Sequence, residues 1–185
     1  SFNTLAGEIL PAKNLDAVQK KLLELGAKIS LLCNNAVFNN GAGSRGNLTE
    51  RALLVFGHEA GFKKEKLERA HPRLFEIPFN SERKYMAVMN KDDGGAMIFV
   101  KGAPEILLPK CSRAERGGRT EEFAPDMKKD IMAKIEKAAG DGLRVILLAH
   151  KTAEKTDSLH ENDLHDLVYA GFISFADPLR PNSAK

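Results

Sequence analysis

The residue types best suited to chemistry gather first around Lys101 and Gly102. An apolar run, Ala96–Val100, leads into them and predicts a strand buried on both faces, and Pro104 follows at the first position of a short helix. Gly102 lets another group approach the backbone, and Lys101 ends the strand with its ammonium aimed across the sheet edge, where it suits an anionic ligand. Taken alone, Lys101–Glu105 favours a plainer interpretation, a strand-to-helix turn with a solvated lysine.

A second candidate is the charged turn between two predicted strands. It begins after Phe79 and carries Arg83 and Lys84. An aromatic ring followed within five residues by two basic side chains can stack on a base and hold its phosphates. A charged turn is also commonly only solvated, so these residues alone leave both interpretations open.

Three further polar residues stand at the ends of predicted elements. Thr49 and Glu50 follow Asn47, which is placed as a helix N-cap with Glu50 at the capping-box position. On spacing alone, Thr49 and Glu50 favour helix capping. Arg144 precedes the apolar run Val145–Ala149 and, considered alone, favours an ion-pair role at the mouth of a buried strand.

Three other patterns do not predict a site. Residues 41–46 match G-x-G-x-x-G, but two asparagines precede them where a buried strand should end, so we expect a flexible loop. His160 and His165 lie five residues apart, about 140° around a helix, and do not share a face. Cys33 and Cys111 lack metal-ligand spacing. We therefore expect no metal site.

Composition excludes several classes of protein. The 185 residues are enough for one domain with a substantial core. With 28 basic and 25 acidic residues the net charge is +3, which is too balanced to indicate nucleic acid or a membrane surface. No secretory signal is visible, no apolar run approaches the roughly 18 residues of a membrane span, and two cysteines favour a reducing compartment. The chain opens and closes without obvious terminal elements, as an excised piece of a longer protein would.

Hydrophobic periodicity predicts an α+β fold, a twisted antiparallel sheet flanked by helices. Helices are expected over 16–25 with Gly26 as C-cap, over 29–33, over 47–60 and over 125–139. Strands are expected over 75–79, 85–89 and 96–101 as an antiparallel meander, then over 145–149 and 168–175. Residues 112–120 are expected as a loop, and 151–166 as loop or helix.

Six short motifs, taken together and in order, resemble the nucleotide-binding domain of P-type cation-transporting ATPases, in particular the calcium-pump-like type II branch. The likeness spans residues from about 30 to 181, and each motif alone is weak. The motifs are Cys33-Asn34, Thr49-Glu50, Phe79 to Met86, Lys101 to Glu105, Gly142 to Val145 and Asp177 to Arg180.

The resemblance implies an ATP pocket. Phe79 would stack on adenine, Glu50 would accept a hydrogen bond from its amino edge, and Arg144 would reach the phosphates. These roles agree with the chemistry, because a π-face suits a flat base, a carboxylate accepts from an amine, and basic groups meet the triphosphate. The implied ATP-binding residues are Thr49, Glu50, Phe79, Lys84, Lys101, Gly102 and Arg144.

The resemblance also implies the domain organisation. Residues 1–181 would form a single nucleotide-binding domain and 182–185 a tail. Within 177–181, Asp177, Pro178 and Arg180 would form the hinge to an absent phosphorylation domain. The implied partners are the phosphorylation, actuator and transmembrane domains of a pump, which makes this a cytoplasmic domain of an integral membrane protein that binds no nucleic acid.

The same resemblance implies an enzyme of which this chain is an inactive part. The parent would be an ATP-driven cation translocase, and the Asp-Lys-Thr-Gly-Thr segment that supplies the family's nucleophile does not occur in this sequence. The chain therefore contains no catalytic residue and should bind ATP, at near-millimolar affinity, without hydrolysing it. Mg²⁺ is expected with the nucleotide, bound mainly by the absent phosphorylation domain.

Two residues depart from the family pattern, and two alternatives stay open. Ser81 stands where many relatives carry a charged residue, and Leu179 stands where a second proline is common. One alternative is a stand-alone, non-catalytic nucleotide-sensing module. The other is the heavy-metal branch of the same pumps, whose His-Pro pair is similar to His71-Pro72.

Overall fold

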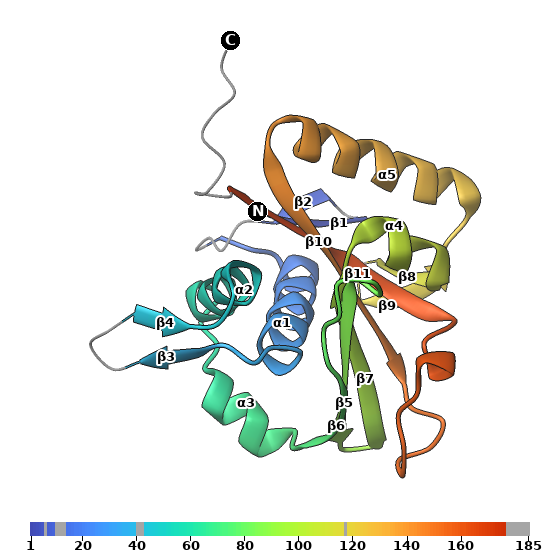
Figure 1. The fold of residues 1–185 in the computed structure, drawn as a ribbon. Coiled ribbons are helices and arrows are strands. Elements are labelled where there is room, and N and C mark those ends of the chain that lie inside the picture. Colours follow the sequence, from blue (N-terminus) through green and yellow to red (C-terminus); the bar gives the residue numbers. More distant parts are fainter. Residues whose placement is uncertain (6, 10–13, 40–42, 117, 177–185) are drawn as a thin grey trace.

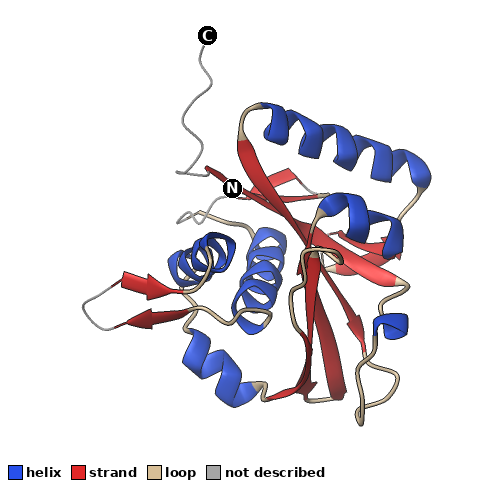
Figure 2. Cartoon of the chain, viewed as in Figure 1, coloured by secondary structure: helices blue, strands red, loops and turns tan. Residues whose placement is uncertain are grey.

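The fold is an open, twisted sheet with helices on both faces (Figures 1 and 2). A computed structural model describes residues 1–5, 7–9, 14–39, 43–116 and 118–176. The main sheet has the strand order β2-β1-β11-β10-β7-β6-β5, with β8 beside β11 and β9 beside β8. Its strands are β1 (Phe2–Thr4), β2 (Gly7–Ile9), β5 (Arg73–Ile77), β6 (Tyr85–Asp92), β7 (Gly95–Gly102), β8 (Cys111–Arg116), β9 (Arg119–Glu122), β10 (Leu143–Thr152) and β11 (Leu167–Ala176).

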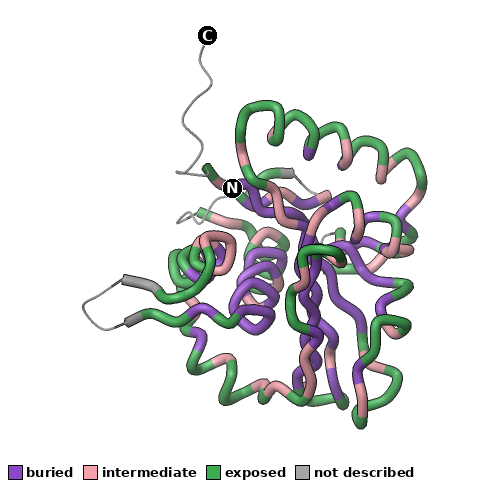
Figure 3. Tube along the Cα trace, in the orientation of Figure 1, coloured by how far each residue is buried: buried purple, intermediate pink, exposed green. Residues whose placement is uncertain are grey.

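The helices form a layer on each face of this sheet. One core packs α1 and α2 against one face, and a second core lies under α4 and α5 on the other face. Figure 3 shows the central strands buried and the outer side of α5 exposed. The helices are α1 (Ala17–Leu32), α2 (Leu48–Glu59), α3 (Lys64–Ala70), α4 (Pro104–Leu107) and α5 (Pro125–Gly140), with 3₁₀ turns at Leu108–Lys110 and Glu161–Asp163.

The predicted α+β class is confirmed, with one addition to the sheet. β8 runs parallel to β11, whereas the other paired strands of the main sheet are antiparallel. The predicted meander is present as β5-β6-β7, and its second turn is tighter than expected because β6 continues to Asp92. β5 lies at the sheet edge, where Pro78 can follow it without removing a ladder hydrogen bond.

The predicted helix end at Gly26 is wrong. A single helix, α1, runs through this position to Leu32, and its N-terminus is closed by a capping box between Asp16 and Gln19. Gly26 instead allows close packing, because a Cβ at this position would lie 2.7 Å from Cζ of the buried Phe2 ring. The glycine therefore permits a tertiary contact that local sequence could not reveal.

The two predicted loops are also wrong where the structure describes them. Residues 112–116 and 119–120 belong to strands β8 and β9, in which Cys111 and Ala114 are the only buried residues, so the composition of these strands resembles that of a loop. Gly43–Arg45 forms strand β4, paired with β3 (Val37–Asn39). Residues 41 and 42 of the predicted loop and the expected hinge and tail at 177–185 lie outside the described residues.

Close packing of α1 on α2 fixes where the first turn of α2 lies. A Cβ on Gly57 of α2 would lie 2.4 Å from Cγ of Leu31 in α1. Both residues are buried, so the Leu31 side chain cannot move into solvent to make room. The two helices can approach this closely only because residue 57 has no side chain.

We expect Gly57→Ala to destabilise the fold. Alanine gains about 1 kcal/mol of helix propensity over glycine, but overpacking a filled core costs about 1–3 kcal/mol and requires the helices to separate. Gly140→Ala is the matched control, because no atom lies within 4 Å of a Cβ at the end of α5. Urea unfolding monitored by circular dichroism should show a lower midpoint for Gly57→Ala only. Equal midpoints for both variants would contradict this packing argument.

Candidate functional site

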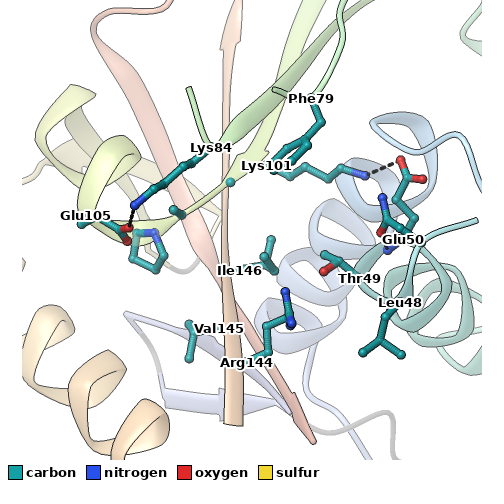
Figure 4. A pocket seen from close by; sticks show the side chains of 14 residues that line it. Leu48, Thr49, Glu50, Phe79, Lys84, Lys101, Glu105, Arg144, Val145 and Ile146 are labelled. Atoms are coloured by element: carbon teal, nitrogen blue, oxygen red, sulfur yellow. Dashed lines mark hydrogen bonds and ion pairs between the residues drawn. The ribbon is translucent and has the colours of Figure 1, made fainter. Parts of the chain in front are cut away.

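A cavity of about 600 Å³ opens where four segments meet: the first turn of α2, the residues before β6, the end of β7 and the start of β10 (Figure 4). All seven ATP-binding residues that the resemblance implied line it, although they span nearly a hundred positions of the chain. They are Thr49, Glu50, Phe79, Lys84, Lys101, Gly102 and Arg144. The fold therefore brings together the aromatic, acidic and basic groups that the motifs supply.

The first turn of α2 is capped differently from the prediction. Asn47 is the N-cap as expected, and its Oδ1 accepts a hydrogen bond from the Glu50 amide at 2.9 Å. The Glu50 side chain does not return to the N-cap to complete a capping box. It turns into the cavity instead. Its negative charge still lies in the first turn of the helix, where it interacts favourably with the positive end of the helix dipole.

A buried ion pair joins α2 to β7. Lys101 Nζ lies 3.2 Å from Glu50 Oε1, and their side chains are 6% and 13% exposed. The same oxygen accepts a hydrogen bond from the Asn35 amide at 3.2 Å, so Oε2 can accept from a further donor in the cavity. β7 lies between β6 and β10, so the Lys101 ammonium does not cross the sheet edge as expected, and its charge is already matched by Glu50.

Phe79 forms one wall of the cavity with an exposed ring. It lies between β5 and β6 and is 57% exposed, which makes it the most exposed large hydrophobic residue among those that the structure describes. Figure 4 shows the ring beside the Lys101 side chain, on the same side of the cavity as Glu50. An aromatic face left open in this way can stack on a flat ligand.

Lys84 and Glu105 form a second ion pair across the cavity from the first (Figure 4). Their Nζ–Oε1 distance is 3.2 Å, and both side chains are about half exposed. Lys84 has a left-handed backbone with φ of 58°, and its carbonyl accepts a hydrogen bond from the Ala103 amide at 2.9 Å. Gly102 permits this approach, because a Cβ there would lie 2.6 Å from the Lys84 oxygen.

The remaining border comes from the start of β10. Arg144, Val145 and Ile146 line the cavity there, so a basic side chain stands beside an apolar surface. The sequence predicted Arg144 as a site residue but gave no site role to Val145, which was only quoted within a motif, or to Ile146, which was assigned to a buried strand. Glu105 was likewise quoted within a motif without a role. The partial burial of the first residues of β10 could be found only from the fold.

A buried asparagine supports Glu50 from behind. Asn34 is fully buried, donates to the Ser30 and Glu50 carbonyls at 3.0 and 2.9 Å, and accepts from the Ala36 amide at 2.7 Å. It therefore joins the end of α1 to the first turn of α2. This gives the Cys33-Asn34 motif a structural role that spacing alone did not indicate.

His71, the residue considered for an alternative site, lies elsewhere. Its Nδ1 is 3.0 Å from Asp92 Oδ1 and 3.2 Å from the Lys91 carbonyl, at the end of β6 remote from Tyr85 and the cavity. Among the residues that the structure describes, no group of three His, Cys, Asp or Glu side chains gathers as a metal ion would require. No helix within those residues has the length and apolarity to cross a membrane.

Comparison with known proteins agrees with this architecture. Residues 23–182 match the family model described as P-type ATPase, cytoplasmic domain N. The match covers most of the chain, including each segment that borders the cavity. The chain therefore belongs to the cytoplasmic N-domain family of P-type ATPases.

Individual relatives support the calcium-pump-like branch. A calcium-transporting ATPase 1 of Lactococcus lactis is 34% identical over 90% of this chain and 19% of its own length. A calcium-transporting ATPase of Bacillus subtilis is 32% identical over 93% of this chain and 20% of its own. A calcium-transporting ATPase 1 of Saccharomyces cerevisiae is 35% identical over 83% of this chain and 17% of its own length. The chain thus spans about a fifth or less of these relatives.

Both cysteine thiols are expected to stay protonated in the folded chain. Burial raises the pKa of Cys33 from its ordinary value of about 9 to about 11, and burial raises that of Cys111 to about 12. Between the ordinary pKa and the raised pKa, a thiol ionises only in the unfolded chain. The contribution of each thiol to folding stability is therefore complete below about pH 9. It is lost as pH rises towards about 11 for Cys33 and about 12 for Cys111. Iodoacetamide at pH 8 should leave the folded chain unmodified and label both cysteines in urea. Equal labelling rates in both states would contradict this burial.

Proposed function

We propose that this chain binds ATP as the nucleotide-binding domain of a cation-transporting P-type ATPase. The observation that carries the proposal is the convergence of an exposed ring, Phe79, with a largely buried carboxylate, Glu50, and separate cations in one cavity. A purine offers a flat face and an amino edge, and a triphosphate offers negative charge. The cavity has a matching group for each of these features.

The base would occupy the side of the cavity between Phe79 and the Glu50–Lys101 pair. Its face would stack on the ring, and its amino group would donate to Glu50 Oε2, the oxygen that Lys101 and Asn35 leave available. Thr49 borders the same side. A keto group in place of the amino group would meet a carboxylate with no proton to share, so this side favours adenine.

The phosphates would extend towards Lys84 and Arg144. Lys84 is paired with Glu105 at the surface, and exposed pairs of this kind are held weakly. A triphosphate carries more negative charge than one carboxylate and would therefore attract Lys84 away from Glu105. Gly102 lets the ligand and the Lys84 backbone share this narrow space without a side chain between them.

The proposed role of the bound nucleotide follows from the family. A cation pump of this class would present the γ-phosphate of ATP to an aspartate in a separate phosphorylation domain, and Mg²⁺ would accompany the nucleotide. The actuator and transmembrane domains of the parent would complete the transport cycle, with this domain on the cytoplasmic side. Because the sequence contains no Asp-Lys-Thr-Gly-Thr segment, this chain should bind ATP without hydrolysing it.

We expect Phe79→Ala to weaken ATP binding about tenfold or more. Loss of one stacked base costs about 1–3 kcal/mol, and wild-type affinity should be near 1 mM, about −4 kcal/mol. Phe38→Ala is the matched control, because Phe38 is also exposed, at 44%, and packs against His58 instead of the cavity. Amide chemical-shift titration with ATP measures both dissociation constants. An unchanged constant for Phe79→Ala would refute the pocket.

Lys84→Met should separate the phosphate side of the cavity from the base side. The variant removes a cation that we assign to the phosphates. ATP binding should therefore weaken several-fold, while adenosine binding stays within twofold of wild type. A charge-assisted contact contributes about 1.5–3 kcal/mol, and the exposure of Lys84 reduces this contribution. Lys66→Met, on the exposed side of α3, is the control for loss of one positive charge. The assignment fails if adenosine and ATP weaken equally.

A further inference from the structure

We propose that Arg83 is a positioning residue, which fixes the turn that presents Phe79 instead of holding phosphate. The sequence interpretation grouped Arg83 with Lys84 as candidate phosphate contacts. In the structure they separate: among the described residues that line the cavity, Lys84 appears and Arg83 does not. This inference rests on the proposed function, because a positioned ring matters only if Phe79 stacks on a base.

The Arg83 guanidinium is held by two partners outside the cavity. Its Nη1 donates to Glu161 Oε1 at 2.6 Å, and its Nη2 donates to the Pro78 carbonyl at 3.1 Å. One side chain thus links Pro78, the residue just before Phe79, to Glu161 in the segment between β10 and β11, which lies 78 positions after Arg83 in the sequence. Planar guanidinium geometry suits such a bridge, because two separate nitrogens donate at fixed angles.

The residues after Phe79 form a closed turn. Asn80 Oδ1 accepts hydrogen bonds from the Glu82 and Arg83 amides at 2.7 and 3.3 Å, and the Asn80 carbonyl accepts from the Lys84 amide at 2.7 Å. These local bonds fix the shape of the turn. They do not fix its position relative to the sheet, which the Arg83 bridge can supply.

The partner segment is anchored well enough to serve as a support. Glu161 opens a 3₁₀ turn whose Asp163 accepts a hydrogen bond from the His160 amide at 2.7 Å. Leu159 and Leu164, on either side of this turn, are buried in the core under α5. The Glu161 side chain is 54% exposed, so the ion pair lies at the surface. The backbone that carries Glu161 is held by the two buried leucines on either side of it.

The Phe79 ring needs support of this kind because it is itself exposed. A buried aromatic is positioned by its neighbours, whereas a ring that is 57% exposed depends on the backbone that carries it. Loss of the bridge would leave the ring attached but less often in the stacking position. Affinity would then fall by the fraction of time the ring is misplaced, and the loss would be the same for every adenine ligand.

The test compares ATP with adenosine in Arg83→Met and Glu161→Gln. Both variants should weaken both ligands by the same factor, about threefold to fivefold, which is the upper range for a partly exposed ion pair. The charge reversal R83E/E161R should not recover the loss, because a carboxylate at residue 83 cannot donate to the Pro78 carbonyl. Glu82→Gln is the matched control, because it removes one negative charge from the same turn without touching the bridge, and it should leave the adenosine constant unchanged.

Each other outcome overturns the inference. Loss of ATP affinity with adenosine unchanged would show that Arg83 contacts phosphate directly, and unchanged affinity for both ligands would show that the bridge does not position the ring. If wild type binds neither ligand, both the proposed function and this inference fail. If wild type binds and Phe79→Ala weakens binding while Glu161→Gln does not, only the inference fails. Glu161→Gln keeps the side-chain shape, so it also answers the question if Arg83→Met does not fold.

Discussion

The buried pair between Lys101 and Glu50 is the interaction on which the arrangement of the site depends. An ammonium removed from water in the middle of a sheet is costly unless a carboxylate meets it. The pair therefore requires the first turn of α2 to lie against β7, and the surrounding packing is built to keep it there. Gly57 brings α2 onto α1, and Asn34 joins the end of α1 to the Glu50 carbonyl. The Lys101–Glu50 ion pair thus explains why α1, α2 and the sheet meet at the cavity.

The two ion pairs of the cavity differ in a way that divides its functions. The Lys101–Glu50 pair is largely buried, and Glu50 accepts a further hydrogen bond from the Asn35 amide, so the pair can act as a fixed surface. The Lys84–Glu105 pair is about half exposed and is screened by water and salt. Under the proposed function, the first pair gives shape to the base side and the second can exchange its carboxylate for phosphate. Rigidity and exchange are therefore separated within one cavity.

Periodicity was sufficient for the elements whose burial follows a simple pattern. The meander β5-β6-β7, the strands β10 and β11 and the amphipathic α5 were all predicted, with boundaries that shifted by a few residues. Gly26 misled because its function is a contact with Phe2, and a glycine within a helix looks locally like a helix end. The β8–β9 hairpin was missed because most of its side chains are polar, and its pairing with β11 is non-local. The partner of Glu50 lies 51 residues away, beyond any local rule.

The charge balance of the cavity bears on how tightly it can hold a nucleotide. Each of its two lysines already has a carboxylate partner, so neither lysine offers a triphosphate an unopposed positive charge. Binding through Lys84 involves an exchange of partners, and an exchange yields less free energy than a new ion pair. Most of the affinity would then come from stacking on Phe79, which makes the orientation of one exposed ring unusually important. Under the proposed function, a site built in this way would bind nucleotide weakly and release it readily.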